Sequence, residues 1–256
     1  MDKQISWPGW ENVRLLGAGS FGKVYEIQRQ ESGETYKAAL KIITIPQNRA
    51  DVVSAYNDGM DDKSVTAYFH SYVEEITKEF ALMSKLKGYT NIVSYEDHMV
   101  VEHENEIGWD ILIRMELLTP LQEYGLTHQL TEEDVIKLGC DICRALELCE
   151  KKKIIHRDIK PENFFVNDNG DFKLGDFGIA RTIERTMASL SKKGTYTYMA
   201  PEVYRGEKYG RTADIYSLAT VLYRYLNYNG PRNPDHIFQN HREHGMIKKT
   251  QRRDKP

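Results

Sequence analysis

The stretch HRDIKPEN, residues 156–163, decides the interpretation of this sequence, because it gathers Asp158, Lys160 and Asn163 in one short segment. Pro161 lies among them, and a proline, which lacks a backbone N–H and has a fixed φ angle, favours a loop over a helix. An acid, a lysine and an amide can serve as a base, a phosphate-binding cation and a metal ligand. The stretch therefore predicts chemistry on a phosphate, provided that the rest of the chain binds a nucleotide.

The bulk composition is that of a globular protein. The chain has 256 residues, of which 40% are hydrophobic and 29% are charged, which suits one large domain or two lobes that share a cleft. Its formal net charge is −3, so nothing draws the whole protein to nucleic acid or anionic lipid. The sequence contains no signal peptide and no apolar run of membrane-spanning length. We expect a cytoplasmic protein without nucleic-acid partners and without a membrane span in this chain.

The N-terminal third of the chain has mainly the pattern of β-strands, and a long helix and two more strands follow it. Residues 13–30 carry two apolar runs around a glycine-rich turn, and residues 35–45 form the next run. Residues 46–62 are polar and mixed, and predict a loop with one short helix. Residues 63–88 have apolar side chains at helical spacing and predict a long helix, whereas residues 91–118 predict two further strands.

From about Thr119 onward the pattern changes to helices. Residues 131–153 begin with a capping motif and continue with apolar residues at helical spacing. This predicted helix contains all three cysteines of the chain, Cys140, Cys143 and Cys149. A single Cys-x-x-Cys is weak support for a metal site, so we interpret the cysteines as small hydrophobic residues of a core helix. Residues 213–228 predict a second helix, apolar on most sides and therefore buried.

A glycine-rich turn links the first two predicted strands. Gly17, Gly19 and Gly22 form a Gly-x-Gly-x-x-Gly pattern, which lets backbone N–H groups approach a phosphate chain. A dinucleotide-binding fold would need a helix directly after this pattern. Residues 23–28 are instead β-branched and aromatic, and predict a hairpin. Taken alone, the pattern supports a nucleotide-binding loop and a structural hairpin equally.

Lys41 lies in the middle of the third predicted strand, AALK. An unpaired buried charge is costly, so a lysine inside an apolar strand needs an anionic partner. The long predicted helix offers Glu75 and Glu79. The alternative, a lysine that extends from a strand edge into water, suits Lys37 better than Lys41.

Two further motifs complete an ordered set, LGDFG at residues 174–178 and YMAPE at residues 198–202. Together with the glycine-rich turn, AALK and HRDIKPEN, they resemble the eukaryotic-like (Hanks-type) protein kinase family over about residues 10–228. The resemblance implies a two-lobed α+β fold. Residues 10–118 would form a small antiparallel-sheet N-lobe with one long helix, and residues 119–228 a mostly helical, catalytic C-lobe.

The resemblance also implies roles for individual residues, with ATP and Mg²⁺ as cofactors. Asp158 would accept or orient the proton of the substrate hydroxyl, and Lys160 would neutralise charge on the γ-phosphate. Asn163 and Asp176 would hold Mg²⁺, a hard cation that prefers oxygen ligands. Phosphoryl transfer depends on positioning and charge neutralisation more than on covalent chemistry.

Other residues would support this machinery. Lys41 would contact the α- and β-phosphates, and the resemblance selects Glu79 over Glu75 as its partner. His156 and Phe177 are interpreted as packing residues that hold the catalytic loops. Asp214 fits the helix that anchors the catalytic loop from below.

The resemblance places ATP between a roof of Val24 and Ala39 and a floor formed by Phe165. Met115 would be the gatekeeper at the back of this pocket, and backbone groups of Glu116 and Leu118 would hydrogen-bond the adenine. The full set of ATP-binding residues is Leu16, Gly17, Ala18, Gly19, Ser20, Gly22, Val24, Ala39, Lys41, Met115, Glu116, Leu118 and Phe165.

The lysine two positions after Asp158, followed by Pro-Glu, resembles the serine/threonine branch of the family, and Thr195 in GTYTYMAPE agrees. We therefore expect transfer of the γ-phosphate of ATP to serine and threonine hydroxyls of protein substrates, with autophosphorylation. Arg157 directly before Asp158 implies a switch by phosphate on the activation segment. That segment offers Thr182, Thr186, Ser189, Ser191 and Thr195, of which Thr186 and Ser189 rank first.

The sequence departs from the family pattern after about Tyr228, where the family continues through several more helices. We expect a C-lobe that lacks its last helices and exposes apolar surface on residues 213–228, followed by a basic, polar and disordered tail over residues 229–256. The insertion at residues 46–62 resembles kinases of Gram-positive bacteria and predicts a bacterial origin.

Two alternatives remain open, a catalytically silent kinase-like binding module or fragment, and a small-molecule phosphotransferase. The complete set of acid, lysine and amide positions favours an active enzyme, whereas the tail over residues 229–256 favours a catalytically silent module. The YMAPE segment argues against a small-molecule substrate.

Overall fold

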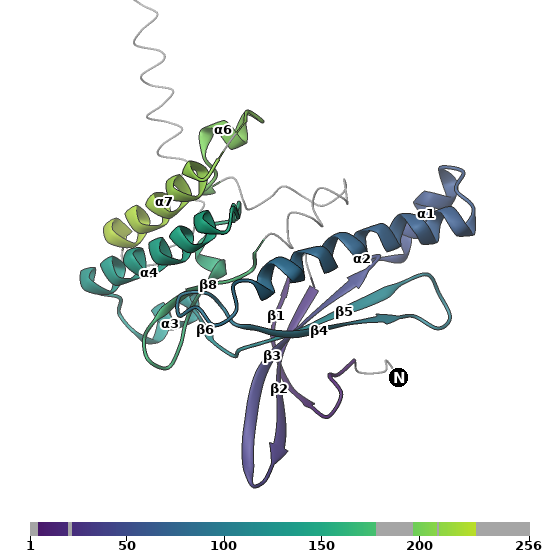
Figure 1. The fold of residues 1–256 in the computed structure, drawn as a ribbon, viewed down its shortest axis with the longest axis horizontal. Helices are drawn as coiled ribbons and strands as arrows, with labels where there is room; N and C mark the ends of the chain where they lie inside the picture. The colour runs from purple at the N-terminus through teal and green to yellow at the C-terminus, as the bar shows by residue number, and fades with distance from the viewer. Residues whose placement is uncertain (1–4, 20–21, 178–196, 209, 229–256) are drawn as a thin grey trace, which may run out of the picture.

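A computed structural model describes residues 5–19, 22–177, 197–208 and 210–228. These residues form an α+β structure in which a sheet-rich N-lobe is followed by a helical C-lobe (Figure 1). The fold class that the sequence predicts is thereby confirmed. The predictions made for residues 229–256 lie outside the described residues.

The N-lobe contains a five-stranded antiparallel sheet with the strand order β1-β2-β3-β5-β4. Its strands are β1 (Glu11–Gly19), β2 (Gly22–Glu31), β3 (Glu34–Ile45), β4 (Tyr95–Glu102) and β5 (Trp109–Met115). β1 and β2 pair directly across the glycine-rich turn. This turn therefore joins the two strands of a hairpin, as the β-branched residues after it predict.

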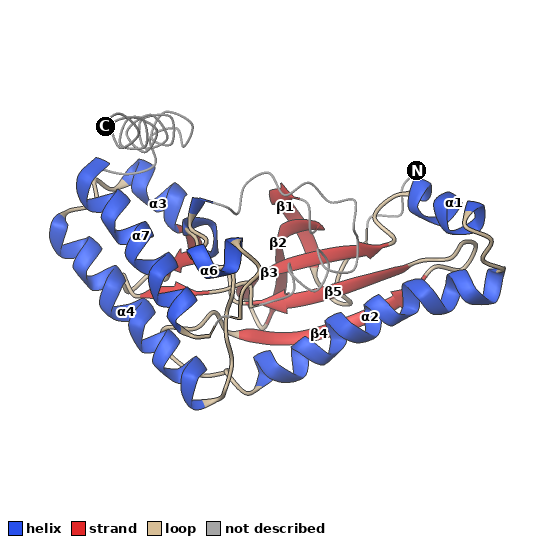
Figure 2. Ribbon diagram, turned by 90° about the horizontal axis from the view of Figure 1, so that it is seen from above, coloured by secondary structure: helices blue, strands red, loops and turns tan. Residues whose placement is uncertain are grey.

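Two helices accompany the sheet, α1 (Arg49–Asn57) and α2 (Asp62–Ser84). Figure 2 shows α2 running along the sheet, with α1 against its N-terminal end. Because side chains alternate across a strand, Ile43 and Ile45 of β3 join the cluster that includes α2 residues, whereas Leu40 and Ile42 belong to a cluster on the opposite face. The N-terminal segment covers that second face. Lys41 lies on the α2 side, among apolar neighbours.

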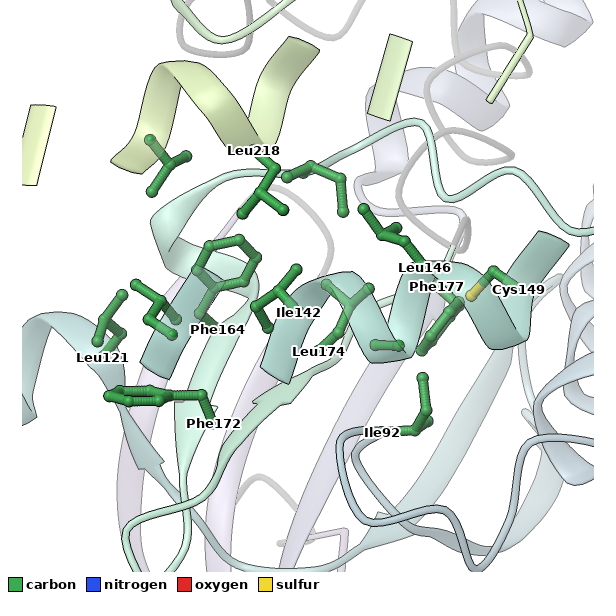
Figure 3. Packing of buried hydrophobic residues seen from close by; sticks show 14 of the residues in the cluster. Ile92, Leu121, Ile142, Leu146, Cys149, Phe164, Phe172, Leu174, Phe177 and Leu218 are labelled. Carbon is green, nitrogen blue, oxygen red and sulfur yellow. The ribbon is translucent and has the colours of Figure 1, made fainter. Parts of the chain in front are cut away.

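The C-lobe is built on helices and one small sheet. Its elements are β6 (Thr119–Pro120), α3 (Leu121–Thr127), α4 (Glu132–Lys151), the 3₁₀ turn η1 (Pro161–Asn163), β7 (Phe164–Val166), β8 (Phe172–Leu174), α6 (Pro201–Tyr204) and α7 (Thr212–Tyr228). Figure 3 shows residues of α4, β7, β8 and α7 meeting in one apolar core. This core holds the loops at either end of β7 and β8 in place.

α4 begins at the predicted capping box, in which Thr131 and Asp134 satisfy each other's backbone N–H groups. Cys149 is buried in the core, as predicted. Cys140 and Cys143 are exposed, however, so the prediction that all three cysteines are core residues was wrong for these two. Their positions on the helix turn them away from β8 and α7, which pack against its other side.

α7 has one buried face and one exposed face. Leu218, Val221 and Tyr225 are buried against the C-lobe core. Ile215 is 50% exposed and Tyr223 is 53% exposed, so burial on most sides holds for one face only, and the other face carries exposed apolar residues, as the sequence analysis expects for residues 213–228. Within the described residues, no helix is long and apolar enough to cross a membrane.

Candidate active site

The loop that contains HRDIKPEN is held from below by α7. The carboxylate of Asp214, in the first turn of α7, accepts the backbone N–H groups of His156 and Arg157, each at 2.8 Å. Arg157 has a φ angle of 68°, in the left-handed region that non-glycine residues seldom adopt. Two hydrogen bonds to one buried carboxylate therefore stabilise a backbone conformation that is otherwise unfavourable. The predicted anchoring role of Asp214 is confirmed.

His156 is buried within the loop and makes two hydrogen bonds through its ring. Nε2 donates to the carbonyl of Gly175 at 2.9 Å, and Nδ1 accepts the N–H of Asp158 at 3.4 Å. This arrangement requires a neutral imidazole with its proton on Nε2. Burial lowers the pKa of His156 and so favours the same neutral form. The ring packs edge-on against Phe177, with centroids 4.7 Å apart, as predicted for a packing pair.

Asp158, Lys160 and Asn163 meet within the loop. Nζ of Lys160 lies 2.8 Å from Oδ2 of Asp158. The side-chain amide of Asn163 donates to the same Oδ2 at 3.0 Å and to the backbone carbonyl of Asp158 at 2.7 Å. With its NH₂ group engaged in this way, Asn163 keeps Oδ1 as an acceptor. The buried carboxylate is therefore fixed in one orientation by an amide and a cation.

Asp176 lies beside Lys41, across the boundary between the two lobes. Nζ of Lys41 is 2.6 Å from Oδ1 of Asp176. The lysine side chain is 8% exposed and the aspartate side chain is 32% exposed. Burial alone would raise the pKa of Asp176, but the Lys41 ammonium outweighs this effect and the pKa lies below its usual range. Asp176 is thus ionised at neutral pH.

The sequence predicted Glu79 as the partner of Lys41, whereas the carboxylate that contacts Lys41 here is that of Asp176. Glu79 is half-buried on α2. The pairing of Lys41 with Glu79 stays a prediction.

A cavity of about 770 Å³ lies between the sheet and the C-lobe, within the range of small-molecule sites. Nine of the predicted ATP-binding residues line it, namely Leu16, Gly17, Val24, Ala39, Lys41, Met115, Glu116, Leu118 and Phe165. Their convergence follows from the strand register, in which Val24 lies opposite Lys41 and Ala39 lies opposite Met115. Asp176 also lines the cavity, so the lining combines apolar side chains with the ion pair of Lys41 and Asp176 and with further charged residues, among them Arg14 and Lys37.

The glycines of the turn differ in their surroundings. Gly22 has a φ angle of +120°, and a Cβ atom there would overlap the carbonyl oxygen of Ile42. Only glycine fits this position without strain. Gly17 and Gly19 have open space where a side chain would stand. Ala18 lies in the same hairpin, and Ser20 lies outside the described residues.

An ion pair that the sequence analysis missed connects the C-terminal end of β5 to β8. Nζ of Lys173 lies 2.8 Å from both carboxylate oxygens of Glu116, and this carboxylate also accepts the N–H of Ser94. The N–H of Glu116 donates to the carbonyl of Ser94 at 3.0 Å, which leaves the carbonyl of Glu116 as its backbone group for an adenine. Lys173 is a charged residue inside a buried strand. Like Lys41, it requires an acidic partner, and its place in an apolar strand is the sequence signal for such a pair.

Asn163 and Asp176 are adjacent in space, because the N–H of Gly175 donates to the backbone carbonyl of Asn163 at 2.9 Å. The amide Oδ1 of Asn163 and the second carboxylate oxygen of Asp176 are hard oxygen donors. Mg²⁺ typically binds through one or two protein oxygens together with phosphates and water. The donor set therefore fits a magnesium–nucleotide complex. Among the described residues, no cluster of three or more His, Cys, Asp or Glu side chains could hold a metal by itself.

The predicted regulatory hydroxyls, Thr182, Thr186, Ser189, Ser191 and Thr195, lie outside the described residues. Of the predicted regulatory positions, only Arg157 is described, and its backbone is held by Asp214.

The chain resembles a known protein family and several known proteins along most of its length. The family model described as "Protein kinase domain" matches residues 10–255 of this chain. "Serine/threonine-protein kinase TIO" of Arabidopsis thaliana is 33% identical over 215 residues, covering 82% of this chain and 14% of that protein. "Serine/threonine-protein kinase 36" of Pongo abelii is 31% identical over 228 residues, covering 89% of this chain and 15% of that protein.

A third relative, "Serine/threonine-protein kinase AtPK1/AtPK6" of Arabidopsis thaliana, is 29% identical over 226 residues. The match covers 87% of this chain and 42% of that protein, so the chain spans less than half the length of each of these relatives. All three come from eukaryotes, and the comparisons give no support to the predicted bacterial origin. The family model covers nearly the whole chain, and the chain therefore belongs to the protein kinase family.

Proposed function

We propose that this chain is a protein serine/threonine kinase, which transfers the γ-phosphate of ATP to hydroxyl groups of protein substrates and also phosphorylates itself. The main support for the proposal is that two parts of a site lie together, a nucleotide-sized cavity and the catalytic loop. Lys41 and Asp176 form an ion pair in the lining of a cavity of nucleotide size. The catalytic loop is tied to the segment before Asp176 through His156 and Asn163.

In this proposal Asp158 orients the acceptor hydroxyl and takes its proton as the oxygen attacks the γ-phosphate. The buried carboxylate is held by Asn163 and Lys160, so it reaches the transition state without reorganisation. Lys160 neutralises charge on the transferring group. Because nothing in this step requires a covalent intermediate, positioning accounts for most of the catalysis.

Lys41 and the two oxygen donors would hold the nucleotide. Lys41 contacts the α- and β-phosphates, and Glu79 is the proposed partner that positions Lys41 when the nucleotide is bound. Asn163 and Asp176 would hold Mg²⁺, which neutralises phosphate charge when bound. The base would lie between Val24 and Ala39 above and Phe165 below, beside Met115, with backbone groups of Glu116 and Leu118 at its edge. These residues line one cavity, which supports the assignment.

The lobe boundaries follow this division of labour. Residues 10–118 would form the ATP-binding lobe and residues 119–228 the catalytic lobe, with residues 229–256 as a polar tail. We place the protein in the cytoplasm, with ATP and proteins as its partners. The shortened C-lobe stays a prediction.

The choice of serine and threonine as acceptors is supported by the lysine at position 160 and by the names of the relatives, all of which are serine/threonine-protein kinases. Arg157 would bind a phosphate on the activation segment, at Thr186 or Ser189, through charge-assisted hydrogen bonds. Thr195 would lie beside the catalytic aspartate.

Intact mass after incubation with ATP and Mg²⁺ tests the proposal. The wild type should gain about 80 Da for each phosphate acquired, and Asp158→Asn should gain none. Asp97→Asn, an exposed position on β4, is the matched control and should behave as the wild type. Folded wild-type protein that neither gains mass nor phosphorylates a protein mixture would contradict the proposal and favour a silent binding module.

A further inference from the structure

Arg224 on α7 contacts the segment that follows the activation loop. Its Nη1 donates to the hydroxyl of Tyr198 at 2.5 Å, and its guanidinium carbon lies 5.0 Å from the centroid of the same ring. Arg224 is half-buried, in the C-terminal half of a helix whose other face enters the core. The arginine therefore reaches from the body of the C-lobe toward Tyr198 and the residues around it.

The charge of Arg224 is only partly satisfied by these contacts. A guanidinium carries five N–H donors in a fixed planar fork and stays charged at every physiological pH. Tyr198 offers one neutral oxygen and a ring face. Among the residues that the structure describes, no carboxylate forms an ion pair with Arg224, whereas Lys137, Arg144 and Lys173 in the same lobe each pair with an Asp or Glu side chain. A half-buried cation of this kind is suited to a planar anion that arrives from outside.

The position of Tyr198 brings this cation close to the catalytic loop. Tyr198 lines a small cavity of about 20 Å³ together with Asp158 and Lys160. Arg224 is thus separated by one side chain from the residues that would handle the acceptor hydroxyl. The segment containing Tyr198 forms part of the wall of this cavity, so a peptide whose hydroxyl reaches Asp158 would approach the catalytic loop beside this segment.

We infer that Arg224 is a specificity-determining residue that selects protein substrates with an acidic or phosphorylated side chain near the acceptor hydroxyl. This inference rests on the proposed kinase function and adds the substrate class to it. Arg224 recognises the carboxylate or phosphate through donors that Tyr198 leaves unused. Tyr198 holds the guanidinium plane in place by its hydroxyl and its ring.

The test uses single-serine peptides in which each flanking position carries Glu or Lys in turn. Their dissociation constants are measured by fluorescence polarisation, and their KM and kcat by phosphate incorporation. For one flanking position, the wild type should bind the Glu peptide on the order of tenfold more tightly than the Lys peptide, as expected for a charge-assisted contact. Arg224→Glu should reverse this preference, and Arg224→Gln should abolish it.

Two controls separate charge recognition from a purely structural role. Tyr198→Phe removes the hydroxyl but leaves the guanidinium charge, so the preference for the Glu peptide should persist even where all affinities fall. Loss of affinity for both peptides in equal proportion in Arg224→Gln would identify a structural residue and overturn the inference. Arg224→Gln also serves where Arg224→Glu does not fold, as judged by circular dichroism.

The binding measurement decides the inference independently of catalysis. Wild-type protein that binds the Glu peptide selectively without phosphorylating any peptide would contradict the proposed function and support the role of Arg224. Equal affinity for Glu and Lys peptides at every position would overturn the inference, whether or not the protein is an active kinase.

Discussion

Two lysine–aspartate pairs serve the candidate site, and they are built in different ways. Lys160 and Asp158 belong to one loop, with Nζ 2.8 Å from Oδ2. Lys41 and Asp176 are separated by 135 positions in the sequence and come from different lobes, with Nζ 2.6 Å from Oδ1. The Asp158 side chain is 5% exposed, whereas that of Asp176 is 32% exposed. The two N–O distances are similar, but the first pair is local in sequence and enclosed, whereas the second is long-range and accessible.

The two pairs are therefore suited to different steps of the reaction. The loop pair is fixed by Asn163 and by a backbone that Asp214 holds, so its geometry is present before any substrate binds. The pair between the lobes depends on how the sheet sits above the C-lobe. Asp176 remains accessible, which suits a residue that must exchange its lysine contact for a metal and a phosphate. We therefore expect the first pair to govern turnover and the second to govern nucleotide binding.

The largest effect is expected for Asp158→Ala. Loss of the group that handles the acceptor proton should lower kcat by about 10²–10⁴-fold. The dissociation constant for ATP, measured by calorimetry, should change by no more than a few fold, because the nucleotide lies on the other pair. An equally large loss of ATP affinity would break the division between the two pairs.

Lys41→Met should weaken ATP binding and lower kcat together, by about 10²-fold in kcat/KM for ATP. The change removes a buried cation from the cavity lining and leaves Asp176 without its contact. Lys87→Met is the matched control, since Lys87 belongs to the same lobe but is exposed, pairs with Glu96 and does not line the cavity. The two variants should be compared by steady-state kinetics with ATP varied. Equal effects would mean that general positive charge, rather than the pair with Asp176, is what the nucleotide requires.

Asp214→Ala should lower the free energy of unfolding by about 2–5 kcal/mol, because the buried N–H of His156 and the partly buried N–H of Arg157 lose their acceptor. The local pair should lose its fixed geometry at the same time, so kcat should fall while the ATP dissociation constant changes little. Urea denaturation measures the stability. Glu133→Ala, exposed on α4, should change it by less than about 0.5 kcal/mol. A stable Asp214→Ala protein with normal kcat would show that the catalytic loop keeps its conformation without Asp214.

Gly22→Ala should destabilise the protein by about 1–3 kcal/mol, since the residue has a φ angle of +120° and no room for a Cβ atom. Gly19→Ala, where a side chain meets open space, should have a smaller effect on stability. Thermal denaturation of the two variants gives the comparison. If Gly19→Ala nevertheless weakens ATP binding more than Gly22→Ala does, the open glycine contacts the phosphates.

The smallest effect concerns pH. Burial lowers the pKa of His156 below its ordinary value of 6.5, so below that pH the unfolded chain binds a proton that the folded chain does not. Stability should therefore fall as the pH drops below 6.5, by at most about 1.4 kcal/mol per pH unit. His156→Gln should flatten this slope in urea unfolding between pH 5 and 7, and exposed His128→Gln should not. An unchanged slope in His156→Gln would assign the pH dependence to other groups.

Short-range features could be predicted because they depend on neighbouring residues. The capping box at Thr131, the hairpin at the glycine-rich turn and the loop with Asp158 all follow from residue types at fixed spacing. Family resemblance then brought in Asp214, a residue distant in sequence whose two hydrogen bonds are present as expected.

Residue types and their spacing are enough to define the chemical groups of the site and the elements that carry them, since periodicity and turn residues act locally. The packing of the two lobes sets which distant groups meet. It placed Asp176 beside Lys41, paired Lys173 with Glu116, and turned Cys140 and Cys143 to the surface of α4. A helical pattern marks an apolar face but not the neighbours that cover it, and a buried lysine requires an acid without specifying which one. Those choices are made by the relative placement of strands and helices, which depends on the whole core.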